Sequence, residues 1–153
     1  MDEDFPSPDA ALPGAAYRVL LQVALLGTEI GEIALSMDIA ETLADLRPDL
    51  PHASIVLAMS DFCAGRKDDG VHRLQDTLIK FPDTQLGKAM LAVCLQNSGR
   101  PGWQPLLEAV IEDGRDEYAV GLASTLLGRP LTGALAAEDG ALPATTPSYA
   151  MWA

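Results

Sequence analysis

Histidine and cysteine are the side chains in this sequence best suited to catalysis or metal binding, and each type occurs only twice. His52 and His72 lie in polar surroundings near the starts of predicted helices, without the placed partner that a general base needs. Cys63 and Cys94 show no Cys-x-x-Cys spacing, and no combination of His and Cys matches a zinc site. No glycine-rich loop follows a predicted strand, so a phosphate-binding loop is absent. We therefore expect a protein that is not an enzyme and needs neither a metal nor a cofactor.

The cysteines and the apolar segments also indicate a cellular compartment. We expect Cys63 and Cys94 to be free, buried thiols in a reducing cytoplasm, and a disulfide between them is the less favoured alternative. The first residues, "MDEDFPSPD", are acidic where a secretory signal needs a basic start and an apolar run. The most apolar segment, residues 19–26, is much shorter than the ~20 residues of a membrane span. The sequence predicts a cytoplasmic protein without membrane insertion.

The charge of the chain excludes one large class of partners. Its formal net charge is -12 and its pI is about 4.3. The ten Lys and Arg residues are scattered between Arg18 and Arg129 and form no basic cluster. Because affinity for nucleic acid comes largely from basic side chains that neutralise phosphates, we expect no nucleic acid partner. An anionic membrane surface is disfavoured for the same reason.

Composition favours helices. Apolar residues make up 48% of the 153 residues, enough to bury the core of one domain. Only 5% are aromatic, while leucine and alanine are abundant. Leucine and alanine favour helices, whereas strands are enriched in β-branched and aromatic residues. The composition predicts an all-α protein.

The sequence contains an internal repeat. One constant shift of the chain against itself aligns several pairs of identical residues, namely Pro48 with Pro82, Leu57 with Leu91, Ala58 with Ala92, Gly65 with Gly99 and Arg66 with Arg100. The same shift, applied one repeat earlier in the chain, aligns Gly31 with Gly65. The spacing matches the period of about 34 residues that is typical of tetratricopeptide repeats, in which each unit is a pair of helices.

Each repeat predicts a helix that ends at a glycine and a second helix that follows. Glycine readily adopts the left-handed conformation found at helix ends. After Gly31 and Gly65, apolar residues recur at three- and four-residue spacing until Pro48 and Pro82 stop the runs. The charged run "RKDD", residues 66–69, is expected to be a solvated turn in which an aspartate caps the next helix.

The predicted fold is a short α-solenoid of about three tetratricopeptide-like helical hairpins with a capping helix, over residues 14–128. The capping helix is expected within 115–128, because an uncapped terminal repeat exposes apolar surface. The acidic segment 1–13 and the Pro-, Gly-, Thr- and Ala-rich segment 129–153 are expected to be disordered tails. The second tail ends in "SYAMWA", and whether it folds back on the protein is left open.

The first helix of each hairpin is expected to line the concave face of the solenoid. The inward positions, judged from the repeat register, are Leu21, Leu25, Ile55, Met59, Phe62, Leu86, Ala89 and Val93. Such a groove is typical of receptors for the apolar face of an amphipathic helix. The alternative is that many of these side chains merely contact the next hairpin.

Three stretches of the sequence resemble a known family. They are "LLQVALLGT" at 20–28, "IALSMDIAETLADLRP" at 33–48 and "GKAMLAVCLQNSGRPGWQPLLEAVIEDGRDEYAVGLASTLL" at 87–127. Together they are similar to the YscG and PscG group of small tetratricopeptide chaperones of bacterial type III secretion. The third stretch also resembles related type III proteins of plant pathogens.

The resemblance implies a chaperone that binds the needle subunit in the cytoplasm, together with a second small helical co-chaperone, and prevents premature polymerisation of the needle. The needle subunit would occupy the groove listed above. The co-chaperone would contact the first hairpin near Leu20, Val23 and Ala24. The alternatives are a general tetratricopeptide adaptor and a chaperone for other type III secretion clients, whose bound segment could be extended.

Overall fold

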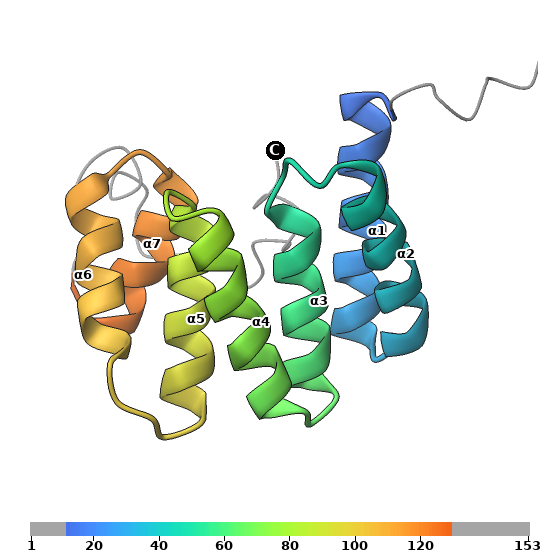
Figure 1. The fold of residues 1–153 in the computed structure, drawn as a ribbon. Coiled ribbons are helices and arrows are strands. Elements are labelled where there is room, and N and C mark those ends of the chain that lie inside the picture. Colours follow the sequence, from blue (N-terminus) through green and yellow to red (C-terminus); the bar gives the residue numbers. More distant parts are fainter. Residues whose placement is uncertain (1–11, 130–153) are drawn as a thin grey trace, which may run out of the picture.

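The computed structural model describes residues 12–129, and each regular element in this range is an α-helix (Figure 1). The helices are α1 (Gly14–Ile30), α2 (Ile33–Leu46), α3 (His52–Cys63), α4 (Lys67–Lys80), α5 (Gln85–Asn97), α6 (Trp103–Asp113) and α7 (Glu117–Leu126). The prediction of an all-α fold is confirmed. The expected tails, 1–13 and 129–153, lie almost wholly outside the described residues, and the predicted domain limits stay predictions.

The three repeated glycines turn the chain between the helices of each hairpin. Gly31, Gly65 and Gly99 have φ angles of 86°, 88° and 66°, a left-handed conformation that other residues rarely adopt. Gly31 ends α1, where its N–H donates to the carbonyl oxygen of Thr28. The same turn therefore recurs at the same position of each repeat, as the sequence predicts.

The helices form two layers of a short solenoid. The odd-numbered helices lie side by side, because α1 contacts α3, α3 contacts α5 and α5 contacts α7. The helices α2, α4 and α6 form the second layer, and each packs against the odd-numbered helices on either side (Figure 1). The helix α7 covers the C-terminal hairpin, which confirms the predicted capping helix.

Three buried hydroxyl groups join the first two hairpins. Thr28 of α1, Ser36 of α2 and Ser60 of α3 are all buried. The Oγ1 of Thr28 lies 2.6 Å from the Oγ of Ser36 and 2.8 Å from the Oγ of Ser60. Each hydroxyl also lies within hydrogen-bond distance of a backbone carbonyl, that of Ala24 for Thr28 and Ser36 and that of Val56 for Ser60, so each of the three protons has an acceptor. A satisfied polar cluster of this kind fixes the register in which α3 docks on the first hairpin.

A buried carboxylate joins α3 to α4. Asp61 is 3% exposed and accepts hydrogen bonds from Arg66 at 2.8 Å and from Arg73 at 3.0 Å. The helix α4 begins at Lys67, and neither Asp68 nor Asp69 caps it with a side-chain hydrogen bond. The expected turn and aspartate cap are therefore wrong, because the turn at Gly65 is short and the helix starts within the "RKDD" run. Both aspartates lie in the first helical turn, where the helix dipole favours negative charge.

Gly70 lets α3 and α4 approach closely. A Cβ atom at Gly70 would lie 2.7 Å from the carbonyl oxygen of Ala58 and 3.1 Å from the Cβ of Phe62. Gly121 in α7 is the opposite case, since a Cβ there meets nothing within 4 Å. The two glycines therefore form a matched pair for testing how tightly the second hairpin packs.

We expect Gly70→Ala to lower the free energy of unfolding by roughly 1–3 kcal/mol, because the added Cβ overpacks the helix interface. Gly121→Ala should raise it by about 0.5–1 kcal/mol, because alanine favours the helical conformation. Urea denaturation followed by circular dichroism measures both values. Equal stability of the two variants would contradict the close approach at Gly70.

Candidate functional site

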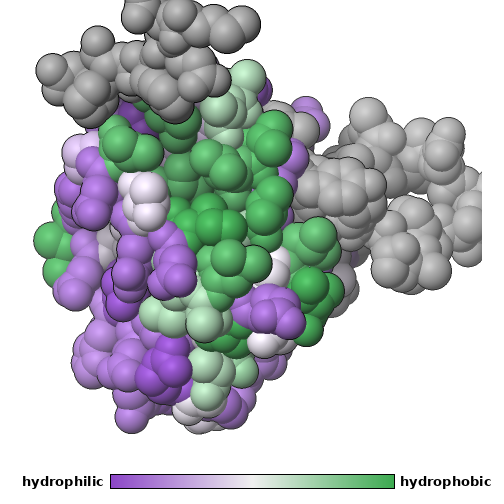
Figure 2. Space-filling view, turned by 90° about the vertical axis from the view of Figure 1, so that its right-hand side faces the viewer, coloured by the Kyte–Doolittle hydropathy of each residue, from purple (hydrophilic) through white to green (hydrophobic). Residues whose placement is uncertain are grey.

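Large apolar side chains are exposed at the N-terminal end of the solenoid. We call this surface the end face; its residues are Val19, Leu20, Val23, Leu26, Ile30, Leu35 and Leu46. Figure 2 looks at this end of the molecule and shows a continuous apolar patch bordered by hydrophilic side chains. Among the described residues, Ile79 of α4 is the one other exposed large hydrophobic side chain. A contiguous apolar patch with a polar border is typical of a protein interaction site.

The spacing of these residues shows why they share one face. Val19, Val23, Leu26 and Ile30 follow one another at intervals of four, three and four residues, which places them on one stripe of α1. Leu35 and Leu46 of α2 are separated by three helical turns and share a second stripe. Six of the seven residues of the end face therefore lie on two helical stripes, one on each helix of the first hairpin, and Leu20 lies to one side of the α1 stripe.

The repeat explains what this face would normally touch. One repeat further along the chain, the positions equivalent to Val19, Val23 and Leu26 are Ala53, Leu57 and Ser60, and all three are buried. In the repeat after that, the equivalent positions are Gly87, Leu91 and Cys94, and these are buried as well. Ser60 shows the contact directly, because its hydroxyl bonds to α1 and α2 of the preceding hairpin. Val19, Val23 and Leu26 therefore form a hairpin-stacking surface with no hairpin of the described chain upon it, whereas Leu35 and Leu46 have the exposed Asp69 and Lys80 as their equivalents in the next repeat.

The eight predicted groove residues lie on α1, α3 and α5, but most are not accessible. Five of them are at most 8% exposed, namely Leu21, Leu25, Ile55, Leu86 and Ala89. The other three, Met59, Phe62 and Val93, are half-buried. The odd-numbered helices pack on one another, and that packing uses the side chains assigned to the groove. Only the three half-buried side chains can contribute to an accessible inner surface.

Of the three residues predicted to contact a co-chaperone, two are exposed and one is buried. Leu20 and Val23 belong to the end face, with 38% and 44% of their surface exposed. Ala24 is buried beneath it, where its carbonyl oxygen accepts hydrogen bonds from Thr28 and Ser36. Sequence reasoning missed the five other members of the face. Their three- and four-residue spacing, in the first of the recognisable repeats, is the signal that could have found them.

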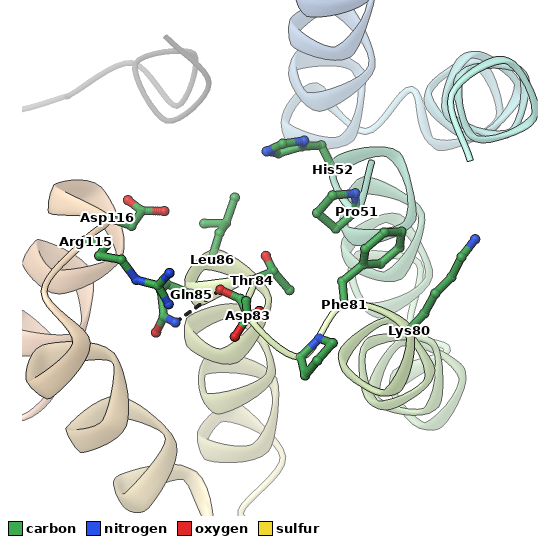
Figure 3. A pocket seen from close by; sticks show the side chains of 11 residues that line it. Pro51, His52, Lys80, Phe81, Asp83, Thr84, Gln85, Leu86, Arg115 and Asp116 are labelled. Carbon is green, nitrogen blue, oxygen red and sulfur yellow. Dashed lines mark hydrogen bonds between the residues drawn. The ribbon is translucent and has the colours of Figure 1, made fainter. Parts of the chain in front are cut away.

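A cavity of about 520 Å³ lies between the start of α3, the α4–α5 turn and the α6–α7 turn. Pro51 and His52 line it from the start of α3, Phe81 from the α4–α5 turn, and Arg115 and Asp116 from the α6–α7 turn (Figure 3). Burial lowers the pKa of His52, while the Asp116 carboxylate acts in the opposite direction. Asp116 also caps α7 by accepting from the N–H of Ala119 at 3.0 Å.

The remaining reactive groups do not assemble a chemical site within residues 12–129. No group of three or more His, Cys, Asp or Glu side chains in this range could hold a metal ion. Both cysteines are free, as predicted, but Cys63 is exposed instead of buried, because it lies at the last turn of α3. Burial raises the pKa of the Cys94 thiol to about 12, with a smaller contribution from Cys63. His72 is exposed on α4, and no helix in this range is long and apolar enough to cross a membrane.

The pKa of His52 predicts a pH dependence of stability. The folded state favours the neutral imidazole, so the unfolded chain binds a proton first as the pH falls below about 6.5. The free energy of unfolding should therefore fall more between pH 7.5 and 5.5 in the wild type than in His52→Gln. Urea denaturation at both pH values checks this difference. Identical slopes for the two proteins would contradict the lowered pKa.

Truncating the end face should leave the fold intact. Val23→Ala is expected to change the free energy of unfolding by less than about 0.5 kcal/mol, because Val23 is exposed and its truncation leaves no enclosed cavity. Leu57→Ala, at the equivalent position of the next repeat, should cost roughly 2–5 kcal/mol, because Leu57 is 4% exposed. Thermal and urea denaturation measure both. A large loss at Val23 would mean that its side chain supports the fold.

Comparison with known proteins identifies a family. A model of the bacterial type III secretion protein family HrpB1_HrpK matches residues 9–131, a range that contains all seven described helices and the end face. No curated protein and no solved structure matches the chain. The predicted connection with type III secretion is therefore confirmed at the level of the family. The chain belongs to the HrpB1_HrpK family of bacterial type III secretion proteins.

Proposed function

We propose that this protein is a cytoplasmic type III secretion chaperone that binds the needle subunit and prevents its premature polymerisation. The observation that carries the proposal is the end face, a stacking surface for helices that no part of residues 12–129 covers. Membership of a type III secretion family supports a role for this surface in type III secretion. The resemblance of the sequence to the YscG and PscG chaperones supports the choice of client.

The chaperone would act by occupancy. A subunit that polymerises through its own helices exposes an apolar helical face before assembly, and contacts of this heterologous kind grow into open filaments. Covering that face with another helical surface stops growth without making or breaking a covalent bond. The proposed activity therefore needs no catalytic residue, no metal and no cofactor, and it involves neither nucleic acid nor a membrane.

Two surfaces are available for two partners. Leu20 and Val23, with the rest of the end face, would receive the second small helical co-chaperone. Met59, Phe62 and Val93 on the odd-numbered helices would contact the needle subunit. The Sδ of Met59 already accepts a contact from the Cys94 thiol at 3.8 Å, and a methionine can adjust its shape to different apolar partners.

A general tetratricopeptide-like adaptor, or a chaperone for another type III secretion client, would use the same surfaces. These hypotheses differ from the needle-chaperone proposal in what the chain keeps soluble. A needle-subunit chaperone must prevent filament growth, whereas an adaptor needs only to bind. Co-expression with the filament-forming subunit therefore separates them.

We expect the filament-forming subunit of the same bacterium to stay soluble when co-expressed with the wild-type protein and to aggregate without it. Val93→Glu should lower the soluble fraction about tenfold, because it places a charge among the half-buried side chains that are proposed to contact the needle subunit. The control is Ile79→Glu, which changes an exposed apolar side chain on another surface and should have no effect. Ultracentrifugation of the lysate measures the soluble subunit. Equal solubility with and without the folded wild-type protein would refute the needle-chaperone proposal.

A further inference from the structure

We propose that the end face binds an amphipathic helix that carries lysine or arginine residues along one edge of its apolar stripe, and that this basic edge lies along α2. The inference rests on the proposed function only in placing a helical partner on the end face. It adds the chemistry of that partner, which follows from the distribution of charge around the apolar patch.

One border of the end face is acidic. At about 100° per residue, Asp38 and Asp45 of α2 project about 20° apart, next to the stripe that contains Leu35 and Leu46. Glu41 lies about 40° further round the same helix. All three carboxylates are exposed. We call these three residues the acidic ridge; Figure 2 shows the hydrophilic band that borders the apolar patch.

The acidic ridge is not neutralised within residues 12–129. Its three carboxylates form no ion pair there, whereas five other acidic residues are paired with arginine, namely Asp49, Asp61, Asp68, Glu108 and Asp113. Arg47, at the end of α2, is engaged by Asp49 at 2.9 and 2.8 Å. The ridge therefore presents unpaired negative charge along the edge of an unoccupied helix-packing surface.

The opposite border has a different character. On the other side of the α1 stripe, the exposed or half-buried polar residues are Arg18, Gln22 and Glu29. These carry both signs of charge and a neutral amide, so they impose no net preference. The asymmetry predicts a partner helix that is basic on one edge and mixed on the other, and it sets which edge faces α2.

A second copy of the chain fits this face poorly. In a two-fold interface, each copy would place its own acidic ridge in the shared surface, and each copy carries a formal net charge of -12. Arg18 is the one exposed arginine of the described first hairpin without an ion pair, which leaves three carboxylates facing one cation. Like charges brought together in this way oppose association.

The chain's own terminal segments also lack the required charge. Residues 130–153 contain two acidic residues and no lysine or arginine. Residues 1–11 contain four acidic residues and likewise no lysine or arginine. Neither segment can neutralise the acidic ridge, so the complementary partner is a separate basic-edged helix.

The test compares two synthetic amphipathic peptides of about three heptads that share the same Leu and Ile stripe. One peptide carries lysine along one edge of the stripe, and the other carries glutamate at the same positions. Fluorescence anisotropy with the full-length protein at about 0.05 M salt measures their dissociation constants. We expect about tenfold tighter binding of the lysine peptide, and about 0.5 M salt should remove most of this preference.

Three variants locate the effect. Asp38→Lys with Asp45→Lys should reverse the preference between the peptides. Asp69→Lys with Asp76→Lys is the matched control on α4, with the same seven-residue spacing of two exposed aspartates, and should leave the preference unchanged. Leu26→Glu should abolish binding of both peptides, while circular dichroism confirms that every variant is folded.

Several results would overturn the inference. These are equal binding of the two peptides, a preference that survives the change of Asp38 and Asp45, and a preference lost equally in the α4 control. A dimer of the wild type that Leu26→Glu dissociates would identify a second copy as the occupant. Peptide binding that appears only after removal of residues 130–153 would identify that segment as the occupant. Any of these results would leave the co-expression test of the needle subunit unaffected, so the two proposals can fail separately.

Discussion

The structure depends on the stacking of one helical hairpin on the next. Within a hairpin, each helix buries one apolar side against the other helix. The apolar sides that remain need a neighbouring hairpin to cover them. Leu57 and Leu91 are buried because each packs against the hairpin that precedes it. Val23 is exposed because no hairpin of the described chain precedes the first one. The C-terminal end solves the same problem with α7, whose Ala119 and Ala123 are buried against the last hairpin. The N-terminal end has no such helix among the described residues, which is why the apolar surface is found there.

Polar contacts decide how the hairpins stack, whereas apolar contacts supply most of the driving force. An alanine- and leucine-rich interface is tolerant of small shifts, because apolar attraction has little directional preference. The hydroxyls of Thr28, Ser36 and Ser60 are directional and must all be paired to be buried without cost. Asp61 plays a similar part within the second hairpin through its two arginines. The hydroxyl contacts hold the first hairpin, and with it the end face, on α3.

The sequence predicted the architecture better than the site. Gly31, Gly65 and Gly99 could be found because a left-handed turn demands a particular residue and therefore repeats visibly. The inward positions were harder, because a packing position accepts any apolar residue and the side of a helix changes with a shift of one residue. Leu21 and Ile55 were thus placed in an open groove although neighbouring helices bury them. The start of α4 was missed because the "RKDD" run has the composition of a turn, while the turn itself needs only Gly65.

The end face also explains how one surface can serve binding without endangering the fold. Side chains that carry both stability and binding constrain each other, since a change that improves one harms the other. Here Leu21, Ala24 and Leu43 of the first hairpin belong to the core, whereas Val19, Leu26 and Ile30 are exposed. A partner helix placed on these side chains would repeat the contact that α3 already makes with the first hairpin. Binding would then extend the solenoid by the same physical interaction that builds it, and the acidic ridge would add the selectivity that apolar stacking lacks.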